Sequence, residues 1–165
     1  MNFKRLLTHL LTPGWLVRRT FSAADLTAIE AEVKVSEQIH RGELRFVIEG
    51  PLPFMHLWRG VSARARATEL FARLGVWDTE ANSGILIYVQ LVDRRVEILA
   101  DRGIAKRVPQ DTWDAICRRM EVAFRLKAYR RGALEAIDEA SRLLALHFPA
   151  RDKNPDELSN RPLVM

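Results

Sequence analysis

The chain has 165 residues, of which 48% are hydrophobic, and its 26 Lys and Arg against 21 Asp and Glu give a net charge of +5. Residues 1–22 carry Lys4, Arg5, Arg18 and Arg19 and no acidic residue, so the other 143 residues, with 22 basic and 21 acidic, are nearly neutral. A domain that binds nucleic acid typically carries a basic stripe along one structured face. The charge distribution therefore argues against nucleic acid as a partner.

The length predicts a single domain with one hydrophobic core. No apolar run reaches the roughly 18–20 residues that span a bilayer. The first 22 residues, interrupted by His9 and Pro13-Gly14, lack the pattern of a secretory signal. Cys117 is the only cysteine, which excludes an internal disulfide and fits a reducing compartment. We therefore expect a cytoplasmic protein, peripheral to the inner membrane if its N-terminal segment binds lipid.

Residues 1–20 are predicted to form a basic amphipathic N-terminal arm. Apolar side chains recur at spacings that place them on one face of a short helix: Phe3, Leu6, Leu7, Leu10 and Leu11. The other face is polar and basic, and Pro13-Gly14 ends the helix before Trp15. An apolar face, an interfacial Trp and unopposed basic residues suit an anionic membrane surface, bound through residues 1–19. The alternative is that this helix docks on the rest of the chain or on a second copy.

Residues 21–149 are predicted to form the folded domain. Its first helix is capped by Ser22 and Asp25 and runs to about Arg41, before Gly42. Apolar periodicity predicts the remaining elements: strands over 43–49, 85–92 and 95–100, and helices over 60–74, about 113–124 and 130–147. The strand over 85–92 is almost wholly apolar, as expected of a central strand covered on both faces.

This order of elements predicts the α/β class: one domain with a small central mixed sheet of about three to four strands packed between α-helices. Residues 150–165 are charged and interrupted by prolines, and we expect them to form a flexible tail. The sequence leaves the oligomeric state open.

The usual signatures of nucleophilic, nucleotide and zinc sites are missing. There is no Gly-rich phosphate loop, no G-x-S-x-G elbow and no set of paired Cys and His ligands. Cys117 lies on an apolar helical stripe, so it is predicted to be a core residue.

The richest polar segment is residues 78–84, directly before the central strand. Asp78, Glu80 and Asn82 place oxygen atoms at alternate positions, like the start of a calcium loop, but the Gly and the closing acid of an EF-hand are not at the required positions. A hard-cation site would need a further carboxylate, and Asp101, just after a strand, is the best placed. The alternative is a turn in which Asp and Asn side chains bond their own backbone.

Glu37, His40 and Glu43 form a second candidate cluster. Glu37 and His40 are in phase with the apolar face of their helix, so they are predicted to point toward the body. The cluster would bind a metal or transfer protons, or it would be a structural ion-pair network completed by Arg45 or Arg102.

Several short motifs, taken in order, resemble the TPM domain family, which is named for a thylakoid lumen protein, a photosystem repair factor and a worm receptor modulator. They are VWDTE at 76–80, NSGILIY at 82–88, DRRVEI at 93–98, ADRGI at 100–104, Trp113, Met120-Glu121, Phe124 and the closing His147-Phe148-Pro149. The resemblance covers about residues 21–149. It is strongest to the short bacterial branch without signal peptide or membrane span.

The resemblance implies a single α/β domain, binding of Ca²⁺ or Mg²⁺ in some members, and the acid phosphatase activity of plant relatives. Asp78, Asn82 and Asp101 stand at positions that match the family's metal-ligand candidates. Ser83 departs from the pattern, since a second Asn is frequent there. Bacterial members are often encoded beside LemA-type membrane proteins, which implies a membrane-protein partner.

Two functions follow as hypotheses. The first is a divalent-cation-binding interaction module at the cytoplasmic membrane face, favoured by the absence of a nucleophile. The second is a metal-dependent phosphatase hydrolysing phosphomonoesters, in which Arg102 clamps phosphate and Glu37 or His40 transfers protons.

Overall fold

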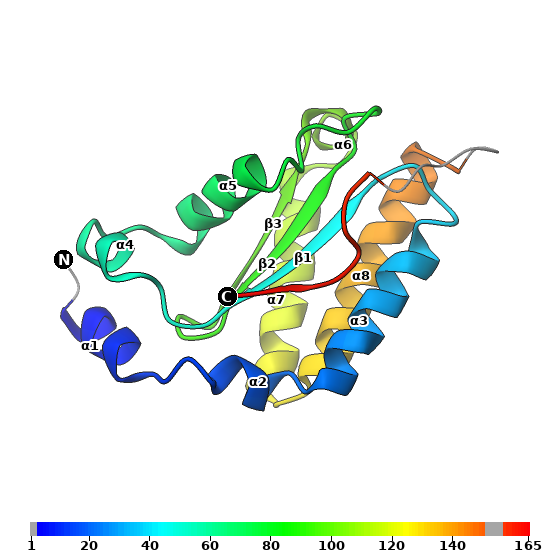
Figure 1. The fold of residues 1–165 in the computed structure, drawn as a ribbon. Coiled ribbons are helices and arrows are strands. Elements are labelled where there is room, and N and C mark those ends of the chain that lie inside the picture. Colours follow the sequence, from blue (N-terminus) through cyan, green and yellow to red (C-terminus); the bar gives the residue numbers. More distant parts are fainter. Residues whose placement is uncertain (1–2, 151–156) are drawn as a thin grey trace.

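A four-stranded mixed sheet runs through the middle of the molecule in the order β3-β2-β1-β4. We obtained the fold as a computed structural model, which describes residues 3–150 and 157–165 (Figure 1). The strands are β1 (Leu44–Glu49), β2 (Ile85–Gln90), β3 (Arg95–Ala100) and β4 (Leu163–Val164). β1 is parallel to both β2 and β4, and β2 and β3 form an antiparallel hairpin.

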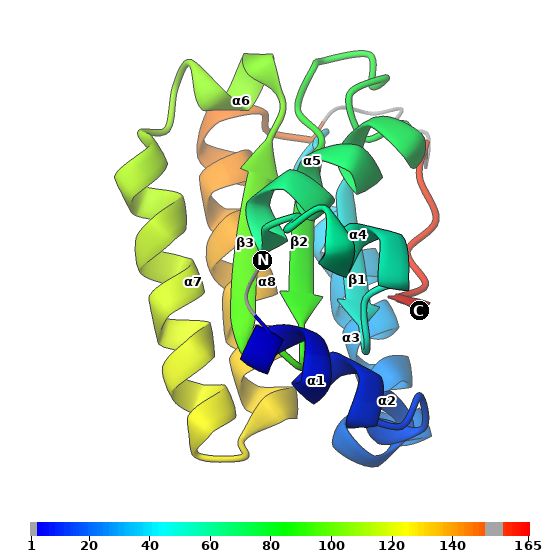
Figure 2. The same cartoon turned by 90° about the vertical axis from the view of Figure 1, so that its left-hand side faces the viewer.

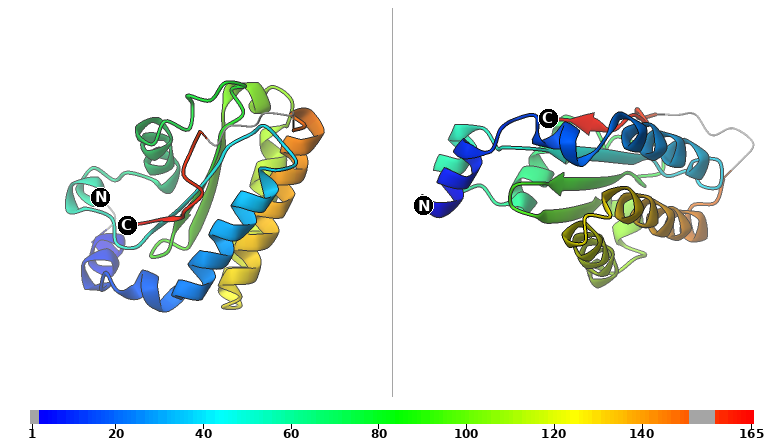
Figure 3. Two further views of the ribbon diagram at one scale, coloured as in Figure 1. Left: turned by 45° about the vertical axis from the view of Figure 1, so that its right-hand side comes forward. Right: turned by 90° about the horizontal axis from the view of Figure 1, so that it is seen from below.

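Three long helices cover one face of this sheet: α3 (Ala23–Ser36), α7 (Gln110–Arg125) and α8 (Tyr129–His147). α4 (Phe54–Trp58) and α5 (Ala63–Arg73) lie on the other face, so that the sheet is the middle layer (Figure 3, left). Every residue of β2 is buried because this strand has neighbours on both sides and helices on both faces. The expected α/β class and mixed sheet are thereby confirmed.

Side chains alternate along the strands between two hydrophobic clusters. The larger cluster lies under α3, α7 and α8 and includes Phe46, Ile87 and Trp113. The smaller lies under α5, where Ala67 and Leu70 pack with strand residues. Cys117 is buried as expected, and burial raises the pKa of its thiol to about 12, so it is not a poised nucleophile.

Local signals placed most element boundaries well. Ser22 and Asp25 form the predicted capping box at the start of α3. α3 ends at Ser36, earlier than the expected end near Arg41. The chain turns there, and His40 forms an isolated antiparallel β-bridge with Pro149. Apolar periodicity did not predict three short helices: α2 (Leu16–Thr20), α4 and α6 (Arg102–Ala105).

The expected flexible tail over 150–165 is wrong for residues 157–165. β4 pairs with the outer edge of β1, and Met165 exchanges backbone hydrogen bonds with Ile48 and Gly50 at 2.9 Å each. The Arg45 guanidinium donates to the carbonyl oxygens of Ser159 and of Arg161, the latter at 2.7 Å. The physical reason is the open edge of β1, whose backbone groups need partners that composition does not reveal. Residues 151–156 lie outside the described residues.

Within the described residues, none of the helices combines the length and apolar character required to cross a bilayer.

Candidate functional site

Residues 78–84 form a tight loop that leads into β2. The Thr79 hydroxyl accepts from the Ser83 amide at 3.1 Å, and the Asn82 amide donates to the Thr79 carbonyl at 3.0 Å. Asn82 adopts a φ of 50°, a left-handed conformation that Asn tolerates better than most residues. The loop is therefore a turn closed by a side chain and by the backbone. The closing side chain is that of Thr79, whereas the sequence had suggested an Asp or Asn side chain.

This loop packs against the segment that follows β3. The Asp101 amide donates to the Gly84 carbonyl at 2.8 Å, and the Gly103 amide donates to the Asn82 carbonyl at 2.9 Å. The Arg102 Nε donates to the Asn82 Oδ1 at 2.8 Å. A Cβ on Gly103 would overlap the Asn82 carbonyl oxygen, so the close approach depends on glycine. The structure thus packs the segment that holds Asn82 against the segment that holds Asp101.

Asp101 carries the most informative group of this site. Its side chain is only 6% exposed. Its Oδ1 accepts from the Arg102 amide at 2.7 Å, whereas its Oδ2 is buried and receives no hydrogen bond from any residue that the structure describes. A buried carboxylate oxygen without a donor is unfavourable, which makes it a natural position for a bound cation.

The third predicted ligand, Asp78, is exposed at the start of the loop. Across residues 3–150 and 157–165, no three His, Cys, Asp or Glu side chains gather in a way that could hold a metal ion. A cation here would therefore depend on Asp101, on the amide oxygen of Asn82 and on loop oxygens. The Arg102 guanidinium already occupies the Asn82 oxygen and would have to move away. The donor set fits a weak hard-cation site, built mainly of neutral oxygens.

Glu37, His40 and Glu43 are all buried. Helical phase predicted this for Glu37 and His40, although α3 ends at Ser36, before both of them. Glu43 Oε2 accepts from the Leu158 amide at 3.0 Å, so this carboxylate anchors the C-terminal segment. Burial lowers the pKa of His40 to about 4, against a weaker opposing effect of hydrogen bonding to backbone carbonyl groups, and keeps the ring neutral at pH 7. This cluster borders the loop, because the Ser83 hydroxyl donates to the Arg41 carbonyl at 3.4 Å.

A polar cluster that the sequence analysis missed lies at the other end of β1. Arg66 Nη2 donates to Glu49 Oε1 at 2.7 Å, and the Tyr88 hydroxyl donates to Glu49 Oε2 at 2.6 Å, all three side chains being buried. Burial and the hydrogen bond to Glu49 raise the pKa of Tyr88. Arg66 also bonds Glu69 at 2.8 Å. One sequence signal could have indicated this cluster. Arg66 directly precedes Ala67, which lies on the inward face of α5, so a charged side chain at this position could be expected to need a buried partner.

These observations define a small α/β domain in which a polar loop before the central strand meets the end of its hairpin partner. The chain belongs to the TPM domain family, whose model matches residues 18–143. The NMR structure of BA42 protein, from the psychrophilic bacterium Bizionia argentinensis, has a similar fold. It is 27% identical, covers 88% of this chain and 95% of its own, and gives a TM-score of 0.77. A search of curated proteins found no match.

Proposed function

We propose that this protein is a divalent-cation-binding TPM-domain module that works through a binding partner and does not turn over a substrate. The observation that carries the proposal is the Oδ2 of Asp101, a buried carboxylate oxygen to which no described residue donates. Ca²⁺ and Mg²⁺ are hard cations that bind carboxylate, amide and carbonyl oxygens. Asp101 and Asn82 would hold the ion, and Asp78 would reach it from the exposed start of the loop.

The surroundings support binding more than catalysis. General acid–base catalysis needs a side chain within reach of the substrate and a pKa near the working pH. His40 is fully buried, and its pKa of about 4 makes it a weak base at pH 7. Glu37 is buried as well. Neither of the predicted proton-transfer residues is therefore open to a substrate.

A metal-dependent phosphatase is the second candidate, and one contact favours it. The Arg102 guanidinium lies beside Asn82, where its remaining N–H groups are suited to bind phosphate oxygens. A bound cation would supply Lewis-acid chemistry in such a site. Arg102 would bind and orient the phosphomonoester, and Asp101 would hold the ion.

Calorimetric titration with CaCl₂ and with MgCl₂ tests the proposal. The wild type should release or absorb heat at millimolar metal, and Asp101→Asn should lose this signal while its amide oxygen still caps the Arg102 amide. Asp111→Asn, which removes an exposed acid at the start of α7, is the matched control and should bind like the wild type. Circular dichroism melting curves would verify that each variant is folded.

No heat from the folded wild type would refute the cation site. A second assay separates the two candidate functions. Hydrolysis of p-nitrophenyl phosphate that requires metal, disappears with Asp101→Asn and persists with Asp111→Asn would replace the binding module with a phosphatase.

A further inference from the structure

The N-terminal helix α1 (Phe3–Leu11) docks on the domain through its polar face. Arg5 donates to both carboxylate oxygens of Asp93, from Nε at 2.9 and 3.1 Å and from Nη2 at 2.7 Å. His9 is buried between two partners: its Nε2 bonds Asp93 at 3.0 Å, and its Nδ1 accepts from the Leu52 amide at 3.0 Å. Asp93 belongs to the β2–β3 turn, so α1 is attached to one end of the sheet (Figure 2).

This docking leaves the apolar face of α1 in solvent. Arg5 and His9 are four residues apart and share the face that meets the domain, so the opposite face points away from it. Its large apolar side chains, with Trp15 just beyond the helix, are about half to three-quarters exposed: Phe3, Leu7, Leu10, Leu11 and Trp15. An amphipathic helix that only packed on its own domain would bury this face and expose the other.

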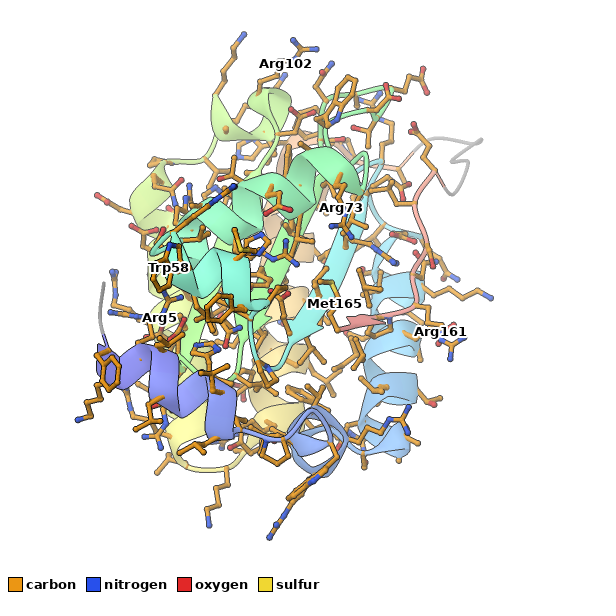
Figure 4. The ribbon with its side chains drawn as sticks, turned by 60° about the vertical axis from the view of Figure 1, so that its left-hand side comes forward. Arg5, Trp58, Arg73, Arg102, Arg161 and Met165 are labelled. Carbon is orange, nitrogen blue, oxygen red and sulfur yellow. The ribbon has the colours of Figure 1, made fainter. Side chains whose placement is uncertain are left out.

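α4 extends the exposed apolar surface. The two helices contact one another and lie side by side at the same end of the molecule (Figures 2 and 3). Phe54, Met55 and Trp58 of α4 are each at least half exposed. Figure 4 shows Trp58 on the same side as Arg5 of α1. Together with α1 and Trp15, they account for eight of the fifteen large apolar side chains that are exposed among the described residues, so the exposure is concentrated.

The segments that form this surface carry no acidic residue, and the neighbouring carboxylates of Asp93 and Glu69 are paired with Arg5, His56 and Arg66. Residues 1–22 and 50–68 contain seven basic residues and no acidic one. Lys4, Arg18, Arg19 and Arg59 are exposed, and the Arg19 guanidinium lies 5.8 Å from the centre of the Trp15 ring. A protein-binding surface is compatible with either charge, whereas apolar and aromatic side chains among exposed basic residues complement anionic lipid headgroups in particular.

We propose that α1, Trp15 and α4 together form a membrane-binding surface, the α1–α4 surface, that inserts its apolar side chains into the headgroup region of an anionic membrane. The surface is composite, because α4 is contributed by a different part of the chain. The Arg5–His9–Asp93 contact fixes the orientation of the domain on the membrane. The polar face of α1 binds the domain, and the basic groups at the rim contact the lipid headgroups.

The same geometry places the candidate cation site away from the membrane. β2 runs from Ile85, just after the candidate site, to the turn that holds α1, and its six residues span about 20 Å. Figure 4 shows Arg102 at the far end of the molecule from Arg5 and α1. The site would face the aqueous side when the α1–α4 surface is bound, and the membrane proposal does not depend on a cation.

Sedimentation with lipid vesicles tests this proposal on the full chain. The wild type should bind vesicles of phosphatidylglycerol and phosphatidylcholine and leave vesicles of pure phosphatidylcholine unbound. Leu7→Gln with Leu11→Gln should weaken binding by about tenfold or more, because it removes apolar side chains that insert. Leu126→Gln with Leu146→Gln is the matched control, since Leu126 at the end of α7 is 70% exposed and Leu146 on α8 is 72% exposed.

A second pair tests the composite nature of the surface: Phe54→Gln with Trp58→Gln should also weaken binding, with Arg5, His9 and Asp93 intact. Failure of the folded wild type to bind anionic vesicles would overturn the proposal, and so would equal losses in the control pair. Full binding by the α4 pair would exclude the composite surface. A dimer seen by analytical ultracentrifugation and lost only in the α1 pair would assign the surface to a second copy instead.

Discussion

Replacing Asp93 by Ala should release α1 from the end of the sheet. In the structure Asp93 is the common acceptor for Arg5 and the buried His9. We take about 1 kcal/mol for the partly exposed pair with Arg5 and about 2 kcal/mol for the buried bond with His9. The sum of about 3 kcal/mol corresponds to a shift on the order of 100-fold in the docking equilibrium of α1.

Amide hydrogen exchange measures this shift directly. Exchange in α1 should accelerate by roughly that factor in Asp93→Ala and by less in Asp93→Asn, which keeps an acceptor for His9. Exchange in β2 should be unchanged. Asp138→Ala, which removes an exposed ion pair with Arg142 on α8, is the control and should have no effect on α1. Equal protection of α1 in the wild type and in Asp93→Ala would refute the reasoning.

The docked state should also tolerate mild acid. Burial by itself would raise the pKa of Asp93, but hydrogen bonds from His9 and Arg5 outweigh it and hold this pKa well below the ordinary 3.8. A carboxylate with a lowered pKa stabilises the folded state above its unfolded pKa, and this contribution is lost as the pH falls below 3.8 toward the folded value. The contribution of Asp93 to the protection of α1, measured as the difference between the wild type and Asp93→Ala, should therefore not be lost between pH 7 and pH 4.5, after correction for the intrinsic exchange rate.

Two further predictions concern buried groups. Arg66→Met should lower the free energy of unfolding by about 3–5 kcal/mol, because it leaves Glu49 buried without its ion-pair partner. Urea unfolding measures this loss. A loss of stability no larger than that of the surface variant Arg142→Met would contradict the prediction. Burial lowers the pKa of His40 from 6.5 to about 4, so stability should be full above pH 6.5 and fall by up to about 3 kcal/mol toward pH 4 as the unfolded chain takes up the proton. Urea midpoints that stay constant from pH 7.5 to pH 4.5 would contradict the second prediction.

The sequence alone determined the class of fold and the family, because both depend on local signals. Alternation and helical periodicity located the three main strands, and the capping box at Ser22 and Asp25 placed the start of α3. The order of motifs around residues 76–104 indicated the TPM domain family, which the family model confirms. Cys117, on its apolar stripe, was placed correctly in the core.

The candidate site was predictable only in part. Spacing indicated Asn82 and Asp101, but their approach depends on the packing of Gly103 against the loop, a contact between segments about 20 residues apart. The ion pair between Glu49 of β1 and Arg66 of α5 could not be predicted either, because no local sequence pattern indicates it. No helical wheel could show that one carboxyl oxygen of Asp101 would be buried without a donor.

Tertiary structure also decided which face of α1 meets the domain. The sequence showed an apolar and a polar face, and hydrophobic burial alone would turn the apolar face inward. One acidic side chain at the β2–β3 turn, Asp93, reverses this choice, because it offers Arg5 and His9 a partner in a position that only the folded hairpin creates. Periodicity identifies the faces of a helix, whereas their orientation depends on charges brought close from more than 80 residues away.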